Sequence, residues 1–386
     1  MYTNIRGFKG KKPSLTEILN ENKPHLFFLT ETQMRSDSNE QIDGYTFFGR
    51  KRNGGLGGGV AFLARNDIKS NLMTHYSERN IEIIWTSIRR KAHPPIFIGT
   101  YYGKQETRTN KEEIEKEMEL LMEEIEEQKN EGEILLTMDG NAKIGLLNES
   151  VSRNGKLLLK LIEETKLVIM NRSEKCKGRI TRQNTKNKDE FSAIDFVLVT
   201  DPVEKWIKQM EIDEKGLYKI SGRNQTDHNT IIIDMTIANL DQIKPTKRVG
   251  WNIRAPEEKW KRFEEELRRT YESAMKILEN NNLEMEEKYN KWYTQIEMAA
   301  RSTIGKTTYK EGHKEKPSSE TQKLRKIKKE LKKDIQKEKD KEKKQLLIDH
   351  YKQIQEMAKE QISKEKSEMI RKKFERIKND KTGKSL

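Results

Sequence analysis

The sequence predicts an α/β or α+β sandwich followed by a helical extension, and three observations support this fold class. Residues 1–240 alternate short β-branched and aromatic runs, typical of strands, with amphipathic runs typical of helices. Beyond about residue 241 no run has the pattern of a strand. Apolar residues make up 33% of the 386-residue chain and charged residues 36%, so part of the chain must lie in water.

The first element is a short helix that leads into a strand. Ser14 and Glu17 have the spacing of a capping box ahead of Leu15 and Ile18. Pro24 then ends the helix, and the strand HLFFL follows.

A set of strands follows, the first of them opened by glycines. The runs GGLGGGVAFLA, IEIIWTSI and PIFIGTYY are typical of successive strands. The glycines also suggest a phosphate-binding loop, but a strand rather than a helix follows them, and the Lys-Ser/Thr of a P-loop is missing. We therefore expect a hairpin at this position.

Two helix-to-strand units and two strands complete the N-terminal region. Residues 111–131 carry apolar side chains at helical spacing, Gly132 ends this helix, and the strand EILLTMD follows. The pattern recurs in NGKLLLKLIEETKLVIMN, and the runs SAIDFVLV and NTIIIDMTI are typical of strands. Together these elements predict more than one sheet packed with helices.

The C-terminal region begins near Pro245 and is predicted to be helical. Residues 255–300 contain Trp260, Phe263 and Leu267 at the steps of an amphipathic helix. Residues 320–378 are rich in Lys and Glu, which predicts a solvated single helix or a loose hairpin held by i,i+4 charge pairs. Contact with nucleic acid is the alternative for this segment.

The positive charge is concentrated at the C-terminal end. Of the formal net charge of +14, residues 321–386 carry +11, with 23 Lys and Arg against 12 Asp and Glu. Such an excess favours a polyanionic partner, nucleic acid first and an anionic membrane second. The single Cys176 excludes an internal disulfide framework, and no apolar run approaches the roughly 20 residues of a membrane span. We expect a soluble intracellular protein.

Carboxylate, amide and imidazole side chains stand at the ends of several predicted strands, where they can converge at one rim of a sheet. Oxygen ligands of this kind select Mg²⁺ or Mn²⁺, and one imidazole beside them suits proton transfer during attack on a phosphate. Taken alone, an Asp at a strand end is more often a turn or cap residue than a catalytic one. The candidates are Asn4, Glu31, Asp139, Asn141, Asp195, Asp227 and His228.

The ordered motifs NIRG, LTET, GTYY, MDGNAKIG, SAID and TDH over residues 1–238 resemble the endonuclease/exonuclease/phosphatase superfamily. NAKIG, NGKLLL and VIMN look most like the endonuclease domain of LINE-type (non-LTR) retrotransposons. The resemblance implies an α+β fold, the DNase I-like four-layer αββα sandwich, over residues 1–240. Residues 241–386 are similar to the linker that precedes reverse transcriptase, with no reverse transcriptase domain expected before Leu386.

The resemblance also implies a role for each candidate. A divalent metal would be held by Glu31, with Asn4 and Asp227 close to it. Asp139 would orient or activate the attacking water. Asn141 and His228 would contact the phosphate, and Asp195 would fix His228. Tyr101 would lie near the phosphate or the leaving group, with Tyr102 as its alternative. Thr181 would contact DNA.

The function expected from these residues is Mg²⁺-dependent nicking of DNA in the nucleus, with RNA as a second partner for the basic C-terminal region. An AP-site repair nuclease and, less favoured, a phosphatase are the enzymatic alternatives. A catalytically inactive scaffold with a nucleic-acid-binding tail is the alternative from another class. It is motivated by the concentration of positive charge in the tail and by a first strand that we expect to be shorter than in the superfamily, because Met1 lies only three residues ahead of Asn4.

Overall fold

The computed structural model describes residues 1–37, 40–52, 57–73, 81–222, 225–238, 248–252, 255–280, 283–309 and 317–379. Its residues form two compact units, one of Met1–Ile243 with Pro317–Leu386 and one of Lys244–Lys316. This grouping differs from the expected division into residues 1–240 and 241–386, because the last two helices pack with the N-terminal unit. Each unit is described by itself.

The first sheet of the larger unit has 8 strands and contains the N-terminus of the chain. Strand β1 lies inside it, parallel to β2 and antiparallel to β16. β1 has 3 residues, and all of them pair with β2. In spatial order the strands are β11 (Cys176–Lys177), β15 (Ile207–Ile212), β16 (Ile231–Met235), β1 (Tyr2–Asn4), β2 (Leu26–Thr30), β5 (Val60–Arg65), β4 (Tyr45–Arg50) and β3 (Gln41–Ile42).

The second sheet has 6 strands. Its centre is the parallel pair β8 and β9, with β14 antiparallel on the other side of β9. In spatial order the strands are β10 (Val168–Ile169), β14 (Asp195–Val199), β9 (Glu133–Asp139), β8 (His93–Tyr102), β7 (Ile83–Arg90) and β6 (Ser70–Leu72). Elements beside the two sheets are the pair β12 (Arg182–Gln183) and β13 (Phe191–Ser192), helix α4 (Asp201–Trp206) and the 3-10 turn Met170–Arg172.

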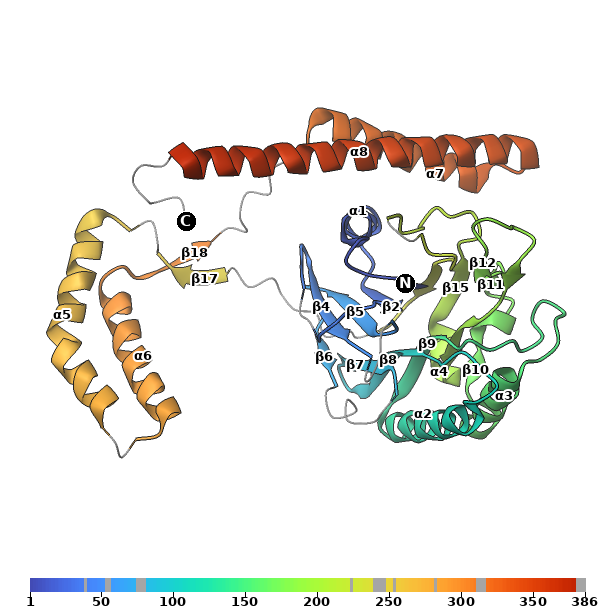
Figure 1. The fold of residues 1–386 in the computed structure, drawn as a ribbon, viewed down its shortest axis with the longest axis horizontal. Coiled ribbons are helices and arrows are strands. Elements are labelled where there is room, and N and C mark those ends of the chain that lie inside the picture. Colours follow the sequence, from blue (N-terminus) through green and yellow to red (C-terminus); the bar gives the residue numbers. More distant parts are fainter. Residues whose placement is uncertain are drawn as a thin grey trace. The chain divides into compact units, whose positions relative to one another are not determined.

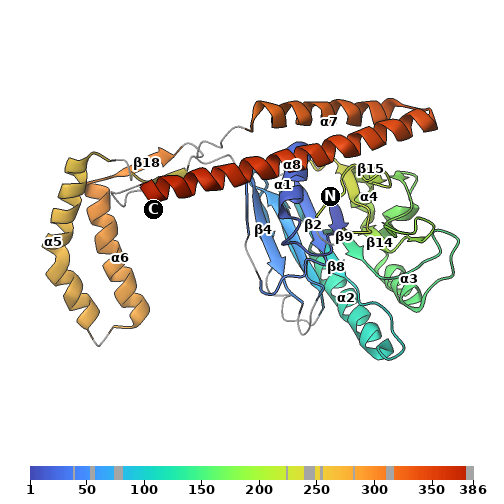
Figure 2. The same cartoon turned by 45° about the horizontal axis from the view of Figure 1, so that its top comes forward.

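The two sheets pack face to face between helices (Figures 1 and 2). Phe28 and Phe62 of the first sheet and Ile98 and Val197 of the second share one buried cluster between the sheets. Helices α2 (Lys111–Glu131) and α3 (Arg153–Thr165) cover the outer face of the second sheet, and α1 (Lys12–Asn22) covers that of the first. The predicted four-layer αββα sandwich is confirmed.

The predicted capping box of the first helix is wrong. Helix α1 begins at Lys12 with proline in its first turn, and Lys11 at the cap makes no side-chain cap hydrogen bond. The Ser14 hydroxyl accepts a hydrogen bond from the backbone N–H of Ser221, 3.0 Å away. Glu17 pairs instead with a lysine from the C-terminal end of the chain, a partner that local sequence spacing does not reveal.

The smaller unit is a helical hairpin joined to a two-stranded sheet. Helices α5 (Glu257–Glu279) and α6 (Met285–Ser302) pair, and β17 (Arg248–Trp251) runs antiparallel to β18 (Lys306–Tyr309). Ala255, Ala300 and Ile304 form its buried cluster, with Trp251 and Phe263 packed against it. The expected amphipathic helix therefore finds its apolar partner within the same unit, and the strands β17 and β18 correct the expectation that none follows residue 241.

Helices α7 (Ser319–Lys337) and α8 (Lys341–Asn379) form a hairpin that packs on the αββα sandwich. Ile335 and Tyr351 are buried with Leu217 of the sandwich, and the Tyr351 hydroxyl donates to the Leu217 carbonyl at 3.0 Å. Lys328 is 3% exposed, and its Nζ lies 3.1 Å from Oε1 of Glu17 and 2.9 Å from Oε1 of Glu21, both on α1. The hairpin is thus docked, whereas the sequence favoured a solvated helix or a loose hairpin.

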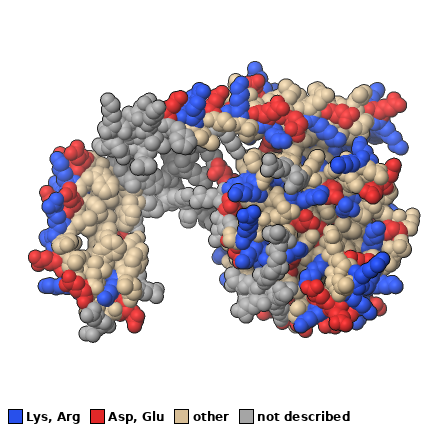
Figure 3. All heavy atoms as spheres, viewed as in Figure 1, with Lys and Arg blue, Asp and Glu red and all other residues tan. Residues whose placement is uncertain are grey.

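The outward surface of this hairpin carries charges of both signs. Figure 3 shows Lys and Arg interspersed with Asp and Glu along α7 and α8 in that view. Among the residues that the structure describes, no helix is both long and apolar enough to cross a lipid bilayer.

Replacing Lys328 with alanine should lower the free energy of unfolding by about 3 kcal/mol, because it leaves the carboxylate of Glu17 buried without its cation. Urea unfolding of the full chain measures this change. The control is Lys329→Ala, which removes an exposed lysine from the same helix and should change the free energy by no more than about 0.5 kcal/mol. Equal effects of the two substitutions would contradict the docked position of α7.

Candidate active site

Strand register brings three side chains of the second sheet to one rim and one face. Asp139, the last residue of β9, is paired with Asp195, the first of β14, and with Tyr102, the last of β8. Residues that pair across neighbouring strands project to the same face. Tyr102 belongs to the cluster between the two sheets, so all three side chains face the first sheet.

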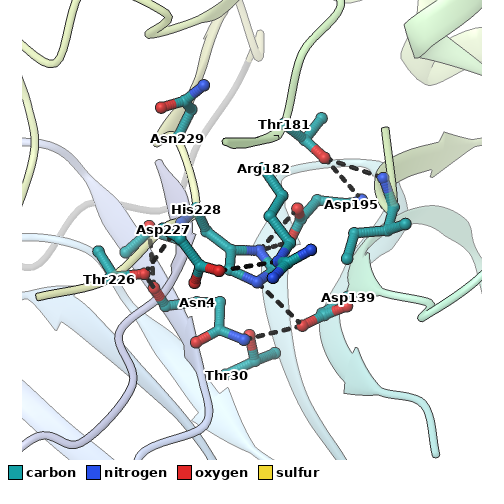
Figure 4. A network of polar contacts seen from close by, with 12 residues as sticks. Asn4, Thr30, Asp139, Thr181, Arg182, Asp195, Thr226, Asp227, His228 and Asn229 are labelled. Atoms are coloured by element: carbon teal, nitrogen blue, oxygen red, sulfur yellow. Dashed lines mark hydrogen bonds and ion pairs between the residues drawn. The ribbon is translucent and has the colours of Figure 1, made fainter. Parts of the chain in front are cut away.

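The first sheet contributes its side chains at the same rim. Asn4 ends β1 and is paired with Thr30, which ends β2 and directly precedes Glu31. His228 lies three residues before β16, which runs antiparallel to β1. The carboxyl ends of β1 and β2 therefore meet the amino end of β16, and Figure 4 shows Asn4, Asp139, Asp195 and His228 turned toward one another.

A hydrogen bond joins His228 to Asp195 across the two sheets. Nδ1 of His228 lies 2.8 Å from Oδ2 and 3.0 Å from Oδ1 of Asp195, so the Nδ1–H donates to this carboxylate. The hydroxyl of Tyr2 donates to the same Oδ1 at 2.9 Å. This arrangement holds the imidazole with its Nε2 directed away from Asp195.

Asp139 is held by two amide groups. Asn4 Nδ2 donates to Asp139 Oδ2 at 2.8 Å, and the backbone N–H of Asn141 donates to Oδ1 at 3.2 Å. Nε2 of His228 lies 3.9 Å from Asp139 Oδ2, which is beyond a hydrogen bond. The imidazole and the carboxylate thus face each other and can both contact a third group.

Burial and charge shift the pKa values of this pair. Burial raises the pKa of Asp139, and the neighbouring Asp195 carboxylate raises it further. Burial alone would lower the pKa of His228, but the carboxylates of Asp195 and Asp139 raise it overall. The pair therefore combines a carboxyl group of increased proton affinity with an imidazole stabilised in its charged form.

Glu31 and Asn141 are placed at the rim by unusual backbone conformations. Their φ angles are 50° and 45°, in the left-handed region that costs a residue with a Cβ about 1 kcal/mol or more. Glu31 Oε1 accepts a hydrogen bond from the Tyr102 hydroxyl at 2.9 Å, and Asn141 Nδ2 donates to the Gly103 carbonyl at 2.8 Å. Backbone strain of this kind is concentrated at functional sites.

Tyr101 is not brought to the site. It lies in the core beneath the outer helices, 1% exposed, and its hydroxyl donates to Glu117 Oε1 at 2.6 Å. Side chains alternate along a strand, so the neighbouring Tyr102 faces the opposite way, toward Glu31. The alternative recognised in the sequence is thus the residue at the rim.

Thr181 does not face outward, contrary to the expected contact with DNA. It is 0% exposed, and its hydroxyl oxygen accepts hydrogen bonds from the backbone N–H groups of Ile194 at 2.9 Å and Asp195 at 3.0 Å. These bonds hold the start of β14 in place. The physical effect of Thr181 is therefore to position Asp195.

Asp227 is close to the other candidates but is bonded to arginines. Its Oδ2 accepts a hydrogen bond from Arg182 Nε at 2.8 Å, and its Oδ1 lies 3.6 Å from a terminal nitrogen of Arg6. Both carboxylate oxygens thus have a cationic partner. This differs from the expected place of Asp227 beside a metal.

The residues on the Glu31 side of the rim fit a hard divalent cation. Glu31, Asn4 and Asp139 offer oxygen atoms, which suit Mg²⁺ or Mn²⁺. Asp139 is 1% exposed, and its pKa is raised first by burial and then by the neighbouring carboxylates of Asp195 and Glu31. Asp139, Asp195 and His228 also offer ligand atoms within 4.8 Å of one another, but Nδ1 of His228 is already bonded to Asp195.

Sequence reasoning did not identify Tyr2, Arg6 or Arg182 as parts of the site. Tyr2 has a detectable signal, because it lies two residues before Asn4 on the same strand and so shares its face. The arginines have none, since surface arginines are common and their approach to Asp227 depends on loops.

Family models match the N-terminal part of the chain. Residues 1–125 match a model described as the endonuclease/exonuclease/phosphatase family, and residues 96–232 match one described as endonuclease-reverse transcriptase. No curated protein matches the sequence.

The chain is also similar to solved structures of low sequence identity. The 3′ phosphatase NExo from Neisseria, bound to a product DNA hairpin, is 14% identical with a TM-score of 0.50, and the match covers 61% of this chain and 98% of that one. The endonuclease domain of TRAS1, a telomere-specific non-LTR retrotransposon, is 19% identical with a TM-score of 0.48, over 61% of this chain and 95% of that one. An AP endonuclease from Archaeoglobus fulgidus is 16% identical with a TM-score of 0.47, over 61% and 98%.

The two adjacent tyrosines should differ in their contribution to stability. Tyr101→Phe removes the donor to a buried carboxylate and should lower the free energy of unfolding by about 1–3 kcal/mol. Tyr102→Phe removes the hydroxyl that donates to Glu31. Water reaches Glu31, so this substitution should lower the free energy of unfolding by less. Chemical denaturation of both variants measures the difference, and a larger loss for Tyr102→Phe would contradict the assigned orientations.

Proposed function

Because residues 1–232 belong to the endonuclease/exonuclease/phosphatase family, we propose that this chain is a Mg²⁺-dependent endonuclease that nicks DNA by hydrolysing a phosphodiester bond. The observation that carries the proposal is the hydrogen-bonded pair of His228 and Asp195 facing the buried Asp139 across 3.9 Å. The model that covers residues 96–232 is described as endonuclease-reverse transcriptase, which favours an activity of the non-LTR retrotransposon type.

The two facing groups have complementary roles in hydrolysis. Asp139 accepts a proton from the attacking water, a role that its raised pKa supports. The water oxygen forms a bond to phosphorus, the bond from phosphorus to the 3′ oxygen breaks, and the leaving oxygen takes a proton from solvent water to become a 3′-hydroxyl. Among the described residues the Nε2–H of His228 has no hydrogen-bond acceptor, so it can donate to an oxygen of the phosphate.

The other residues hold this pair in position. Tyr2 and Thr181 support Asp195, and Asn4 directs Oδ2 of Asp139 toward the imidazole. Asn141 would hydrogen-bond the phosphate through the second N–H of its Nδ2, because the first donates to the Gly103 carbonyl. Mg²⁺ held by Glu31 and Asn4 would neutralise charge that develops on the phosphate oxygens.

Neutral replacements of the facing pair should abolish most nicking. Asp139→Asn and His228→Gln should each lower the rate at which supercoiled plasmid is nicked in Mg²⁺ by about 100- to 10,000-fold, since the first removes the acceptor of the water proton and the second removes the donor to the phosphate. The control is His350→Gln, an exposed histidine of α8, which should nick at the wild-type rate. Unchanged nicking by either site variant would refute the proposed roles.

Removing the metal provides a separate measurement. EDTA should stop nicking by the wild-type protein, and added Mg²⁺ should restore it. Comparing intact and abasic duplexes under the same conditions distinguishes the proposed activity from AP-site repair. A large preference for the abasic duplex would favour repair.

A further inference from the structure

Asp227 lies between two arginines that come from different parts of the chain. Arg6 follows β1 and approaches Oδ1, whereas Arg182 begins β12 and donates to Oδ2. Arg182 also forms an isolated β-bridge with His228, and Figure 4 shows its side chain reaching over to Asp227. The three residues therefore form one charged group next to the catalytic imidazole.

The electrostatics of this group disfavour a metal at Asp227. Burial opposes ionisation of Asp227, but His228, Arg182 and Arg6 together hold its pKa below the ordinary value. The carboxylate is thus already neutralised by cations. A divalent ion there would meet the repulsion of both guanidinium groups, whereas Glu31 has no arginine bonded to it among the described residues.

The arginines keep most of their hydrogen-bonding capacity. A guanidinium has five N–H donors, and among the described contacts Arg182 uses its Nε while Arg6 makes an ion pair that is longer than a hydrogen bond. The side chains are 39% and 50% exposed, so their free donors reach solvent. Arginine with free terminal nitrogens is well suited to bind a phosphate by two parallel hydrogen bonds.

The backbones of both arginines are fixed. The N–H of Arg6 donates to Asn4 Oδ1 at 3.0 Å, and its carbonyl accepts from Nζ of the buried Lys11 at 2.9 Å. Arg182 is paired with Ser192 in the small sheet as well as with His228. Groups mounted this rigidly lose little conformational entropy when a ligand binds.

We infer that Asp227 does not hold the metal but orients Arg6 and Arg182 as a clamp for a phosphate group of DNA on the His228 side of the site. The inference rests on the proposed function. It divides the rim into a metal side at Glu31 and a phosphate side at Asp227. Arg182 and Arg6 contact the substrate, and Asp227 is a positioning residue that acts through them.

The DNA-binding half of the test needs no metal. Fluorescence anisotropy with a labelled duplex in EDTA should show that Arg6→Gln and Arg182→Gln each weaken binding several-fold. Each should also reduce the salt dependence of the binding constant by about one phosphate contact. Arg182→Lys keeps the charge and should retain the salt dependence. The matched control is Arg65→Gln, which also removes an Arg–Asp ion pair and should bind DNA as the wild type does. Arg65 is the last residue of β5, whereas Val60 at the other end pairs with Thr30 beside the site.

The metal half of the test uses nicking. Asp227→Asn should leave the Mg²⁺ concentration for half-maximal nicking unchanged. Added to the Arg6→Gln, Arg182→Gln double variant, it should lower the nicking rate no further, because it acts through the arginines. Thermal unfolding identifies any variant that fails to fold. If Arg182→Gln does not fold, Arg182→Lys replaces it in the measurements of DNA binding.

Two results would overturn the clamp. One is wild-type DNA binding by both arginine-to-glutamine variants. The other is a tenfold higher Mg²⁺ requirement in Asp227→Asn, which would return Asp227 to the metal. Absence of nicking by the wild-type protein would instead refute the proposed function, and the anisotropy measurements in EDTA would still test the clamp.

Discussion

The hydrogen bond between His228 and Asp195 is the interaction on which the site depends, because it joins the two sheets at their shared rim. Asp195 belongs to the second sheet and His228 precedes a strand of the first. The contacts of Tyr2 with Asp195 and of Asn4 with Asp139 cross between the sheets in the same way. Buried polar groups must be paired, so the packing of the sandwich and the geometry of the site constrain each other.

This constraint explains why residues far apart in the chain form one centre. The pairing of Asp139 with Asp195 follows from the register of β9 and β14, and a shift of β14 by one residue would turn Asp195 toward the outer helices. Loops supply what the strands cannot, since Glu31 and Asn141 reach the rim through left-handed backbone conformations. The register of the strands thus determines how far apart Asp139 and Asp195 lie, and the loop conformations determine where Glu31 and Asn141 point.

Much of this arrangement could be predicted from the sequence, because strand periodicity and helix patterns are local. The strands ending at Thr30, Tyr102 and Asp139 were recognisable, and the motif order placed their ends together. What could not be predicted depends on contacts distant in sequence. Glu17 matched a capping box, but its partner Lys328 lies 311 residues away along the chain. Which of Tyr101 and Tyr102 faces inward depends on a strand register that the motif alone does not determine.

The charges around the rim predict where a divalent metal binds. Among the described residues Glu31 and Asp139 have no arginine partner, whereas Asp227 pairs with both Arg6 and Arg182. A crystal of the protein soaked in Mn²⁺ and measured for anomalous scattering tests this division most directly. We expect one manganese peak in contact with the Glu31 carboxylate and none at Asp227. A peak bound by Asp227, or His228 turned away from Asp139 in the same crystal, would contradict it.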